Sequence, residues 1–160
     1  MDQEAKKKAL KMLTCGLYVV AARDGDQVAA GTITWMSQAS FTPPLVMTAI
    51  RNDSHLHGVV EKTRAFAISV VSTEQKAIAA AFFRTSQVED GKINGYAVRD
   101  GQETGAPIVN ECPAWMEARV VDSVARGDHT VYVAEVVDAG CTDDSAKALV
   151  LSNTEWSYGG

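Results

Sequence analysis

Two short segments, one at each end of an apolar stretch, carry side chains that could hold a polar ligand. The first is TWMSQASFTPP (34–44) and the second is RNDSHLH (51–57). Both are rich in hydroxyl, amide and imidazole groups, and Arg51 with two histidines adds charge to the second. The second segment also begins a predicted helix, whose free N–H groups favour an anion. Antiparallel strands bring such segments together, so the pattern suits a phosphate attached to a polyhydroxyl chain.

The same two segments also fit a purely structural interpretation. Trp35 and Met36 offer flat or soft apolar contact for a ring, which favours a ligand that carries one. Ser54, however, needs only to cap a helix, and the serines of the first segment can satisfy turn backbones. From residue types and spacing alone, both interpretations stay open.

Bulk composition excludes several classes of protein. The chain has 160 residues, of which 46% are hydrophobic and 22% charged, as expected for one folded domain spanning residues 1–160. A net charge of −5 argues against nucleic-acid binding, which needs a basic face. No apolar run is long enough for a membrane span, and MDQEAKKKALKML lacks the apolar centre of a signal peptide. We therefore expect a cytoplasmic protein without a membrane partner.

Cysteine and histidine spacing gives no metal motif. The three cysteines lie far apart without a CxxC pair, so neither a zinc site nor a disulfide framework is predicted. His55 and His57 are close in sequence, but no further ligand stands at helical or strand spacing from them. We expect no metal site.

The elements that must position the polar segments follow from periodicity. Helices are predicted over 4–13, from Asp53 or Ser54 onward, and from the Ser72–Gln75 capping box onward. Apolar or alternating runs predict strands, two of them forming a hairpin about Asp24-Gly25. These strands lie at 17–35, 44–51, 65–71, 114–125 and 129–140.

Six or so strands, several joined as hairpins and interrupted by short helices, predict a mainly β fold, a barrel with helical insertions. Residues 84–107 are polar and rich in glycine, and we expect a long excursion with little regular structure. No GxGxxG or GxxxxGK[ST] motif occurs, so neither a Rossmann site nor a P-loop is predicted.

The order of the motifs resembles one family. GTITWMSQASFTPPLVMTAIRNDSHLH is followed by ETGAPIV, AWMEARVV, GDHTVYVAEVVDA and a terminal WSYGG. This series, from about Leu13 to the end, resembles the flavin reductase-like family, especially flavoredoxin-like members and the reductase modules of rubredoxin or flavodiiron proteins. The resemblance implies a Greek-key split β-barrel of the FMN-binding type, made mainly of β-strands with short helices.

The resemblance also implies a set of flavin-binding residues. One group would line the isoalloxazine ring and ribityl chain of FMN: Thr32, Thr34, Trp35, Met36 and Ser37. A second group would surround the phosphate: Arg51, Asn52, Ser54, His55 and His57. His129 in GDHT would lie near the flavin or the nicotinamide as the catalytic candidate, although a strand-start histidine bonded to its own turn is the alternative.

Three functions are compatible with such a pocket. In the first, NADH or NADPH gives a hydride to the flavin, which passes electrons to an acceptor such as a rubredoxin or flavodiiron protein. In the second, the chain is an FMN-bearing electron carrier without NAD(P)H activity. In the third, the pocket takes another small anion. Strand 129–137, apolar on both faces, and Trp115 predict a homodimer with the flavin near its interface.

Overall fold

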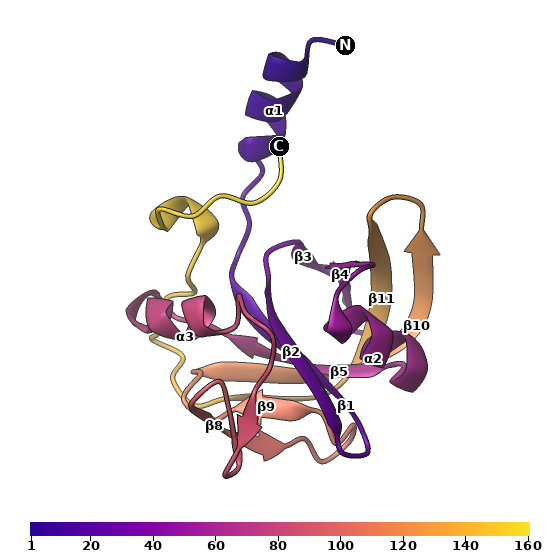
Figure 1. The fold of residues 1–160 in the computed structure, drawn as a ribbon, viewed down its shortest axis with the longest axis vertical. Coiled ribbons are helices and arrows are strands. Elements are labelled where there is room, and N and C mark those ends of the chain that lie inside the picture. Colours follow the sequence, from indigo (N-terminus) through magenta and orange to yellow (C-terminus); the bar gives the residue numbers. More distant parts are fainter.

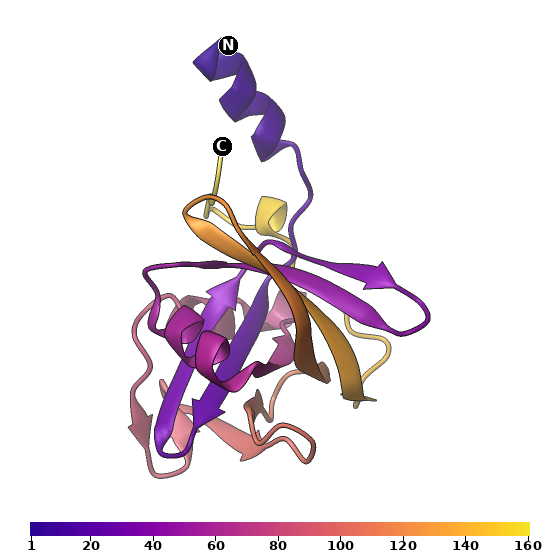
Figure 2. The same ribbon diagram turned by 90° about the vertical axis from the view of Figure 1, so that its right-hand side faces the viewer.

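The computed structural model describes residues 1–160 and is built around one strongly curved antiparallel sheet (Figures 1 and 2). Its seven strands run in the order β2-β1-β5-β10-β11-β4-β3. Their bounds are β1 (Tyr18–Asp24), β2 (Gln27–Ile33), β3 (Met36–Ser40), β4 (Leu45–Arg51), β5 (Ala65–Val70), β10 (Ala114–Ala125) and β11 (His129–Cys141).

The two edge strands of this sheet, β2 and β3, are consecutive in sequence but are not hydrogen-bonded to each other. The sheet therefore curls without closing, which leaves a split beside the end of β2. The mainly β class with short helices, and the split-barrel type, are confirmed. The prediction of six or so strands was low by one for the main sheet.

Two helical segments begin where capping residues stand in the sequence. In α2 (His55–Thr63), the Ser54 hydroxyl accepts a hydrogen bond from the His57 N–H at 3.1 Å. The Ser72–Gln75 capping box opens a 3₁₀ turn, η1 (Thr73–Gln75), which continues as α3 (Lys76–Ala81). A second 3₁₀ turn, η2 (Leu151–Asn153), precedes the C-terminal residues. The predicted helices at 54 and 72 are confirmed.

The first helix, α1 (Gln3–Lys11), stands away from the rest of the chain, beside the C-terminus (Figures 1 and 2). Asp2 caps it by accepting from the Glu4 and Ala5 N–H groups at 2.9 and 3.2 Å. None of its residues is buried. A helix of this length gains little stability in water without packing, and apolar side chains at its end, Leu10, Met12 and Leu13, stay 47%, 83% and 66% exposed.

The segment 84–107 corrects the expectation of little regular structure. It forms a second, four-stranded sheet of β6 (Val88–Glu89), β7 (Lys92–Ile93), β8 (Tyr96–Asp100) and β9 (Pro107–Val109). Asp90 and Gly91 turn the first hairpin with φ of 49° and 73°, the left-handed conformation that an Asp-Gly pair favours. The glycines mark turns between very short strands rather than an irregular loop.

The segment TWMSQASFTPP is also more regular than its composition indicates. Residues 36–40 form β3, an edge strand whose polar side chains Ser37 and Gln38 face solvent. Beside it, the apolar run 44–51 led us to expect a central strand covered on both faces, but β4 leaves Met47 45% exposed. Polar residues are therefore used here at a sheet edge, which is where natural sheets place them.

Candidate functional site

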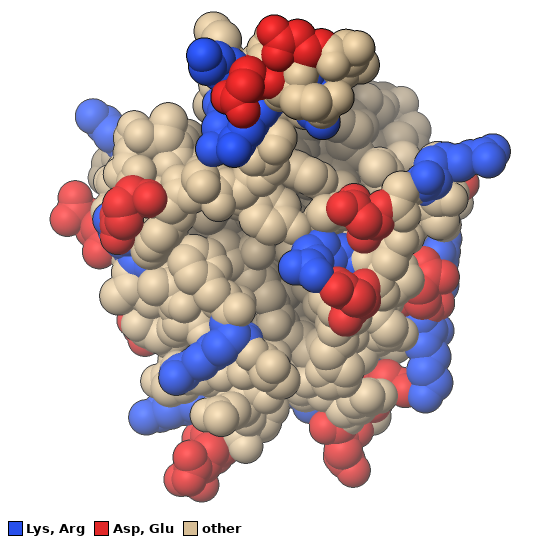
Figure 3. Space-filling view, turned by 45° about the horizontal axis from the view of Figure 1, so that its top comes forward, with Lys and Arg blue, Asp and Glu red and all other residues tan.

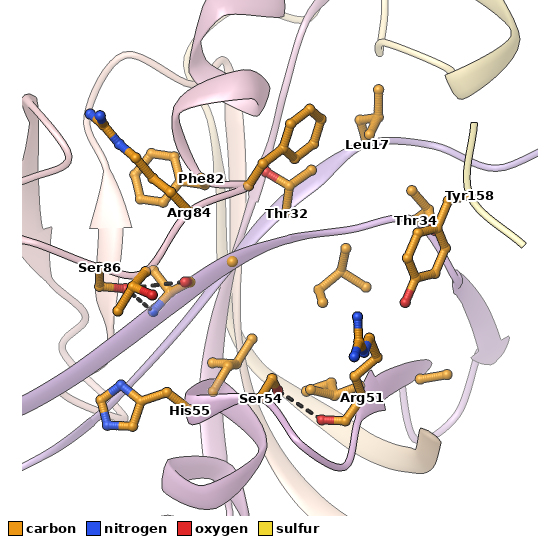
Figure 4. Close-up of a pocket in the computed structure, with 18 of the residues that line it drawn as sticks. Leu17, Thr32, Thr34, Arg51, Ser54, His55, Phe82, Arg84, Ser86 and Tyr158 are labelled. Carbon is orange, nitrogen blue, oxygen red and sulfur yellow. Dashed lines mark hydrogen bonds between the residues drawn. The ribbon is translucent and has the colours of Figure 1, made fainter. Parts of the chain in front are cut away.

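A pocket with a volume of about 710 Å³ lies at the split in the sheet. Its walls come from the end of β2, the junction of β4 with α2, the segment 82–86 after α3, and the C-terminal residues 151–158 (Figure 4). In the space-filling view the same side of the molecule is hollowed, with basic and acidic groups at the rim (Figure 3). Half of the lining residues, 11 of 22, are hydrophobic.

Five of the residues expected at a flavin site line this pocket: Thr32, Thr34, Arg51, Ser54 and His55. They belong to β2, the residue that follows it, and the β4–α2 junction, which the antiparallel sheet and helix start bring together. The two polar segments therefore meet at this pocket only through their ends, Thr34 in one and residues 51–55 in the other.

The other expected residues lie outside the lining. Met36 and Ser37 are on the edge strand β3, and Trp35 lines a neighbouring pocket between residues 10–15 and the C-terminal residues. Asn52 and His57 are held by Thr130: the Thr130 hydroxyl donates to Asn52 Oδ1 at 2.8 Å and lies 3.0 Å from His57 Nε2. This network joins the start of α2 to β11, so these two side chains support the wall rather than forming it.

The hydroxyl groups of Thr32 and Thr34 are in different situations. Thr32 Oγ1 donates to the carbonyl of Ala79 at 2.7 Å and so ties β2 to α3. Thr34 is only 8% exposed, and its hydroxyl has no hydrogen-bond partner in the chain. Buried hydroxyls are nearly always paired, because leaving one unpaired costs about 1–3 kcal/mol. A ligand with a polar edge at this wall would supply the partner.

Two arginines line the pocket, and they differ in whether an acidic side chain of the chain pairs with them. Arg51 is paired with Asp53, with Nε at 3.0 Å from Oδ1 and Nη2 at 2.5 Å from Oδ2. Arg84, at the opposite end of the cavity in Figure 4, makes no ion pair or side-chain hydrogen bond within the chain. His55, Ser54 and the N-terminus of α2 face the same cavity. The Arg84 end is therefore the part of the pocket with an uncompensated positive charge.

His129, the catalytic candidate, does not line the pocket but is hydrogen-bonded to a residue that does. Its Nε2 lies 2.7 Å from the Tyr158 hydroxyl, and its Nδ1 lies 2.7 Å from Asp128 Oδ1. The Trp35 ring packs on the imidazole with centroids 4.6 Å apart. The hydrogen bond from His129 lowers the pKa of Asp128, and burial raises the pKa of the Tyr158 phenol. At neutral pH the carboxyl is ionised and the phenol is protonated.

The sequence profile described as "Flavin reductase like domain" matches residues 10–159. The chain belongs to this family. The reductase component of 4-nitrophenol 4-monooxygenase/4-nitrocatechol 2-monooxygenase from Rhodococcus opacus is 32% identical over 87% of this chain and 72% of its own length. The NADH:FMN oxidoreductase of Rhodococcus erythropolis is 29% identical over 91% of this chain and 75% of its own length.

The fold of this family member is also found among solved structures. The NADH:FAD oxidoreductase SgcE6 of Streptomyces globisporus C-1027 superposes with a TM-score of 0.81 at 23% identity, covering 95% of this chain and 90% of SgcE6. Some relatives are longer: the chain spans 22% of a Synechocystis protein assigned as diflavin flavoprotein A 3 and 49% of an Aeropyrum pernix protein.

Several pocket residues of this flavin reductase-like chain were not predicted as site residues from the sequence. They form the segment FFRTS, residues 82–86, whereas the terminal WSYGG, with Trp156 and Tyr158, was expected to help close the site of a dimer. A signal for Arg84 existed: it follows the predicted end of an apolar helix, where a lone cation has no neighbouring acid. No signal within WSYGG indicated that this C-terminal segment lies beside the end of β2.

Three further observations concern the chain outside this pocket. No group of three or more His, Cys, Asp or Glu side chains is arranged to hold a metal ion. Burial raises the pKa of the Cys112 thiol to about 12, so this cysteine stays protonated and unreactive at neutral pH. None of the helices is both long and apolar enough to cross a bilayer.

Proposed function

We propose that this chain binds FMN in the pocket at the split and catalyses its reduction by NADH or NADPH. The observation that carries the proposal is a single cavity with an unpaired cation at one end and a buried, unpartnered hydroxyl, that of Thr34, at its wall. The NADH:FMN oxidoreductase of R. erythropolis, a relative over most of its length, supports the choice of reaction.

The proposed binding residues lie at the two ends of the pocket, one for the phosphate and one for the ring. Arg84, with His55 and the N-terminus of α2, would hold the phosphate, because all of them offer positive charge or N–H donors. Thr34 would meet a polar edge of the ring, and the apolar lining would exclude water from it. The bound flavin supplies the hydride chemistry, and the protein supplies position, electrostatics and access.

Anaerobic spectroscopy of the purified protein tests this function. With FMN present, NADH or NADPH is expected to bleach the flavin absorbance, and riboflavin, FMN and FAD titrations give the preferred flavin. Flavin binding without bleaching by either nicotinamide would instead favour the electron carrier. A protein that binds none of the three flavins would contradict the proposal.

The acceptor is proposed to be a second protein component. The R. opacus relative is named as the reductase component of a monooxygenase, which supports a partner that uses reduced flavin. A rubredoxin or flavodiiron partner stays a prediction. Stopped-flow reoxidation of the reduced protein with and without each candidate distinguishes them, since only a true acceptor accelerates the step.

We further propose that the working unit is a homodimer. The outward face of β4, β10 and β11 is apolar, with Met47, Val121, Val124 and Val131 exposed by 45%, 54%, 50% and 37%. Val131 pairs with Val124 on one side and with Ala49 on the other, so these side chains form one continuous surface. The apolar side chains at the end of α1 are exposed as well. A second copy that covers both surfaces would remove a liability to aggregation.

A charge placed on this surface is expected to separate the dimer. Val124→Asp puts a carboxylate at the proposed interface, whereas Val88→Asp, on β6 and exposed by 58%, puts one elsewhere. Sedimentation at low micromolar concentration should give twice 17.1 kDa for the wild type and the Val88 variant, and 17.1 kDa for the Val124 variant. A wild-type mass of 17.1 kDa would rule the dimer out.

A further inference from the structure

We propose that Tyr158, and not His129, is the residue that contacts the ring-bearing ligand, and that it accepts a hydrogen bond from an amide N–H of that ligand. His129 and Asp128 act through Tyr158 as positioning residues. This inference rests on the proposed function, because the two ligands with such an edge are the pyrimidine side of the flavin and the carboxamide of the nicotinamide.

The geometry assigns the contact to the phenol. Tyr158 lines the pocket, and in Figure 4 its hydroxyl points into the cavity toward the Arg51 side chain, with Thr34 close by. His129 is absent from the lining, its side chain is 11% exposed, and both ring nitrogens are engaged within the chain. A ligand in this cavity therefore meets the tyrosine oxygen before it can meet the imidazole.

The hydrogen-bond partners fix the direction in which Tyr158 can bond. Asp128 is ionised and can only accept, so Nδ1 of His129, 2.7 Å from Asp128 Oδ1, carries a proton, and in the neutral tautomer it carries the only one. Nε2 is then an acceptor and takes the phenol proton, across 2.7 Å from the Tyr158 oxygen. With its proton directed to His129, the phenol oxygen presents only lone pairs to the cavity.

No other group of the chain uses those lone pairs. Arg51 is the nearest labelled cation in the cavity, but two of its nitrogens are directed to the Asp53 carboxylate. The tyrosine ring is held edge-on by Trp35, with centroids 5.2 Å apart, which limits its rotation. The chain thus presents a fixed acceptor at the ring end of the pocket, opposite the cationic Arg84 end.

Ligands that lack the N–H group test the inference. For the nicotinamide the probe is reduced 3-acetylpyridine adenine dinucleotide, in which a methyl ketone replaces the carboxamide. For the flavin it is FMN methylated at the ring nitrogen N3. The wild type should bind one of the two about tenfold more weakly than its parent, since a hydrogen bond contributes about one tenfold step. The readouts are the flavin Kd by fluorescence titration and, for the nicotinamide, KM separated from kcat.

Variants then assign the discrimination to Tyr158. In Tyr158→Phe the tenfold preference should fall below threefold, because the acceptor oxygen is gone. His129→Leu should do the same and add nothing in the Tyr158→Phe background, whereas His129→Gln, whose amide oxygen can accept the phenol proton, should restore the preference. Glu155→Gln is the control, because it removes the other anchor of the C-terminal segment, the ion pair with Lys76, without touching the phenol.

The outcomes separate this inference from the proposed function. A wild type that reduces FMN but shows no preference for either parent ligand overturns the role of Tyr158 and leaves the function intact. A preference that survives in Tyr158→Phe also overturns the role of Tyr158. A preference that Glu155→Gln abolishes to the same extent as Tyr158→Phe overturns it too. A wild type that neither binds nor reduces flavin contradicts both, and a preference in the flavin Kd alone identifies the flavin as the ligand concerned.

Discussion

Glu117→Ala is expected to lower the free energy of unfolding by about 3 kcal/mol, which for a chain of this size lowers Tm by roughly 10 °C. Glu117 lies on β10, is 0% exposed, and is the acceptor for three groups of the segment before β9. The Glu103 and Thr104 N–H groups lie at 3.2 and 2.7 Å from its Oε2, and the Thr104 hydroxyl lies at 2.6 Å.

The effect is large because Glu117→Ala leaves buried hydrogen-bond donors without an acceptor. Three donors that now bond a carboxylate would face a cavity, and each unpaired buried group carries a desolvation cost. Gly101 fits closely over the same carboxylate, where an added Cβ would lie 2.2 Å from Oε2. The second sheet is therefore fastened to the first by a buried anion, and thermal unfolding of Glu117→Ala measures that attachment.

The contribution of Glu117 should also depend on pH. Burial raises its pKa, but hydrogen bonds from Thr104 and Glu103 outweigh this and hold the pKa below the usual range. The unfolded chain then binds the proton more tightly, so the stabilisation is complete above about pH 5 and is lost as pH falls through the folded-state pKa. Urea unfolding of the wild type and Glu117→Gln from pH 7 to pH 3 should show their difference shrinking in acid.

A matched control separates this effect from a general loss of charge. Glu89 is exposed on β6 and makes no hydrogen bond through its side chain, so Glu89→Gln should leave both the stability and its pH dependence unchanged. A difference between the wild type and Glu117→Gln that stays constant with pH would show that the carboxylate does not titrate in the folded state as proposed.

Local signals in the sequence were sufficient for the elements they specify. The Ser54 cap, the Ser72–Gln75 box and the Asp24-Gly25 turn each act within a few residues, and the structure confirms the elements they begin. The Asp90-Gly91 turn was equally local but was masked by the polar residues around it. For residues 84–107, the Asp90-Gly91 dipeptide predicts a hairpin turn, whereas the polar composition of the whole segment indicated an irregular loop.

Contacts between distant residues explain what the sequence could not reveal. Glu117 binds residues 13 and 14 positions away, and Tyr158 reaches His129 across 29 positions, pairings that no periodicity encodes. Trp35 and His129 were assigned to the flavin from resemblance, yet they pack on each other behind Tyr158. The resemblance pointed to the part of the fold that holds the pocket, whereas the cavity wall depends on which side of each strand faces inward.

Arg84→Gln is expected to weaken FMN binding roughly 10- to 150-fold, the equivalent of about 1.5–3 kcal/mol for one charge-assisted hydrogen bond to phosphate. Riboflavin, which has no phosphate, should bind the wild type and the variant equally. The expectation rests on the state of the free protein, in which Arg84 reaches the cavity without an acidic partner. Fluorescence titration with each flavin measures the two affinities.

Arg51→Gln provides the decisive comparison, because it removes a second arginine of the same pocket. The Arg51 guanidinium is already bound by both oxygens of Asp53, and its side chain is 56% exposed, so a phosphate would gain little from it. We expect less than a threefold change in FMN affinity. Arg126→Gln, in the exposed turn between β10 and β11, controls for net charge. If Arg51→Gln weakened FMN more than Arg84→Gln did, the phosphate would lie at the Tyr158 end, and the ring would have to point toward residues 82–86.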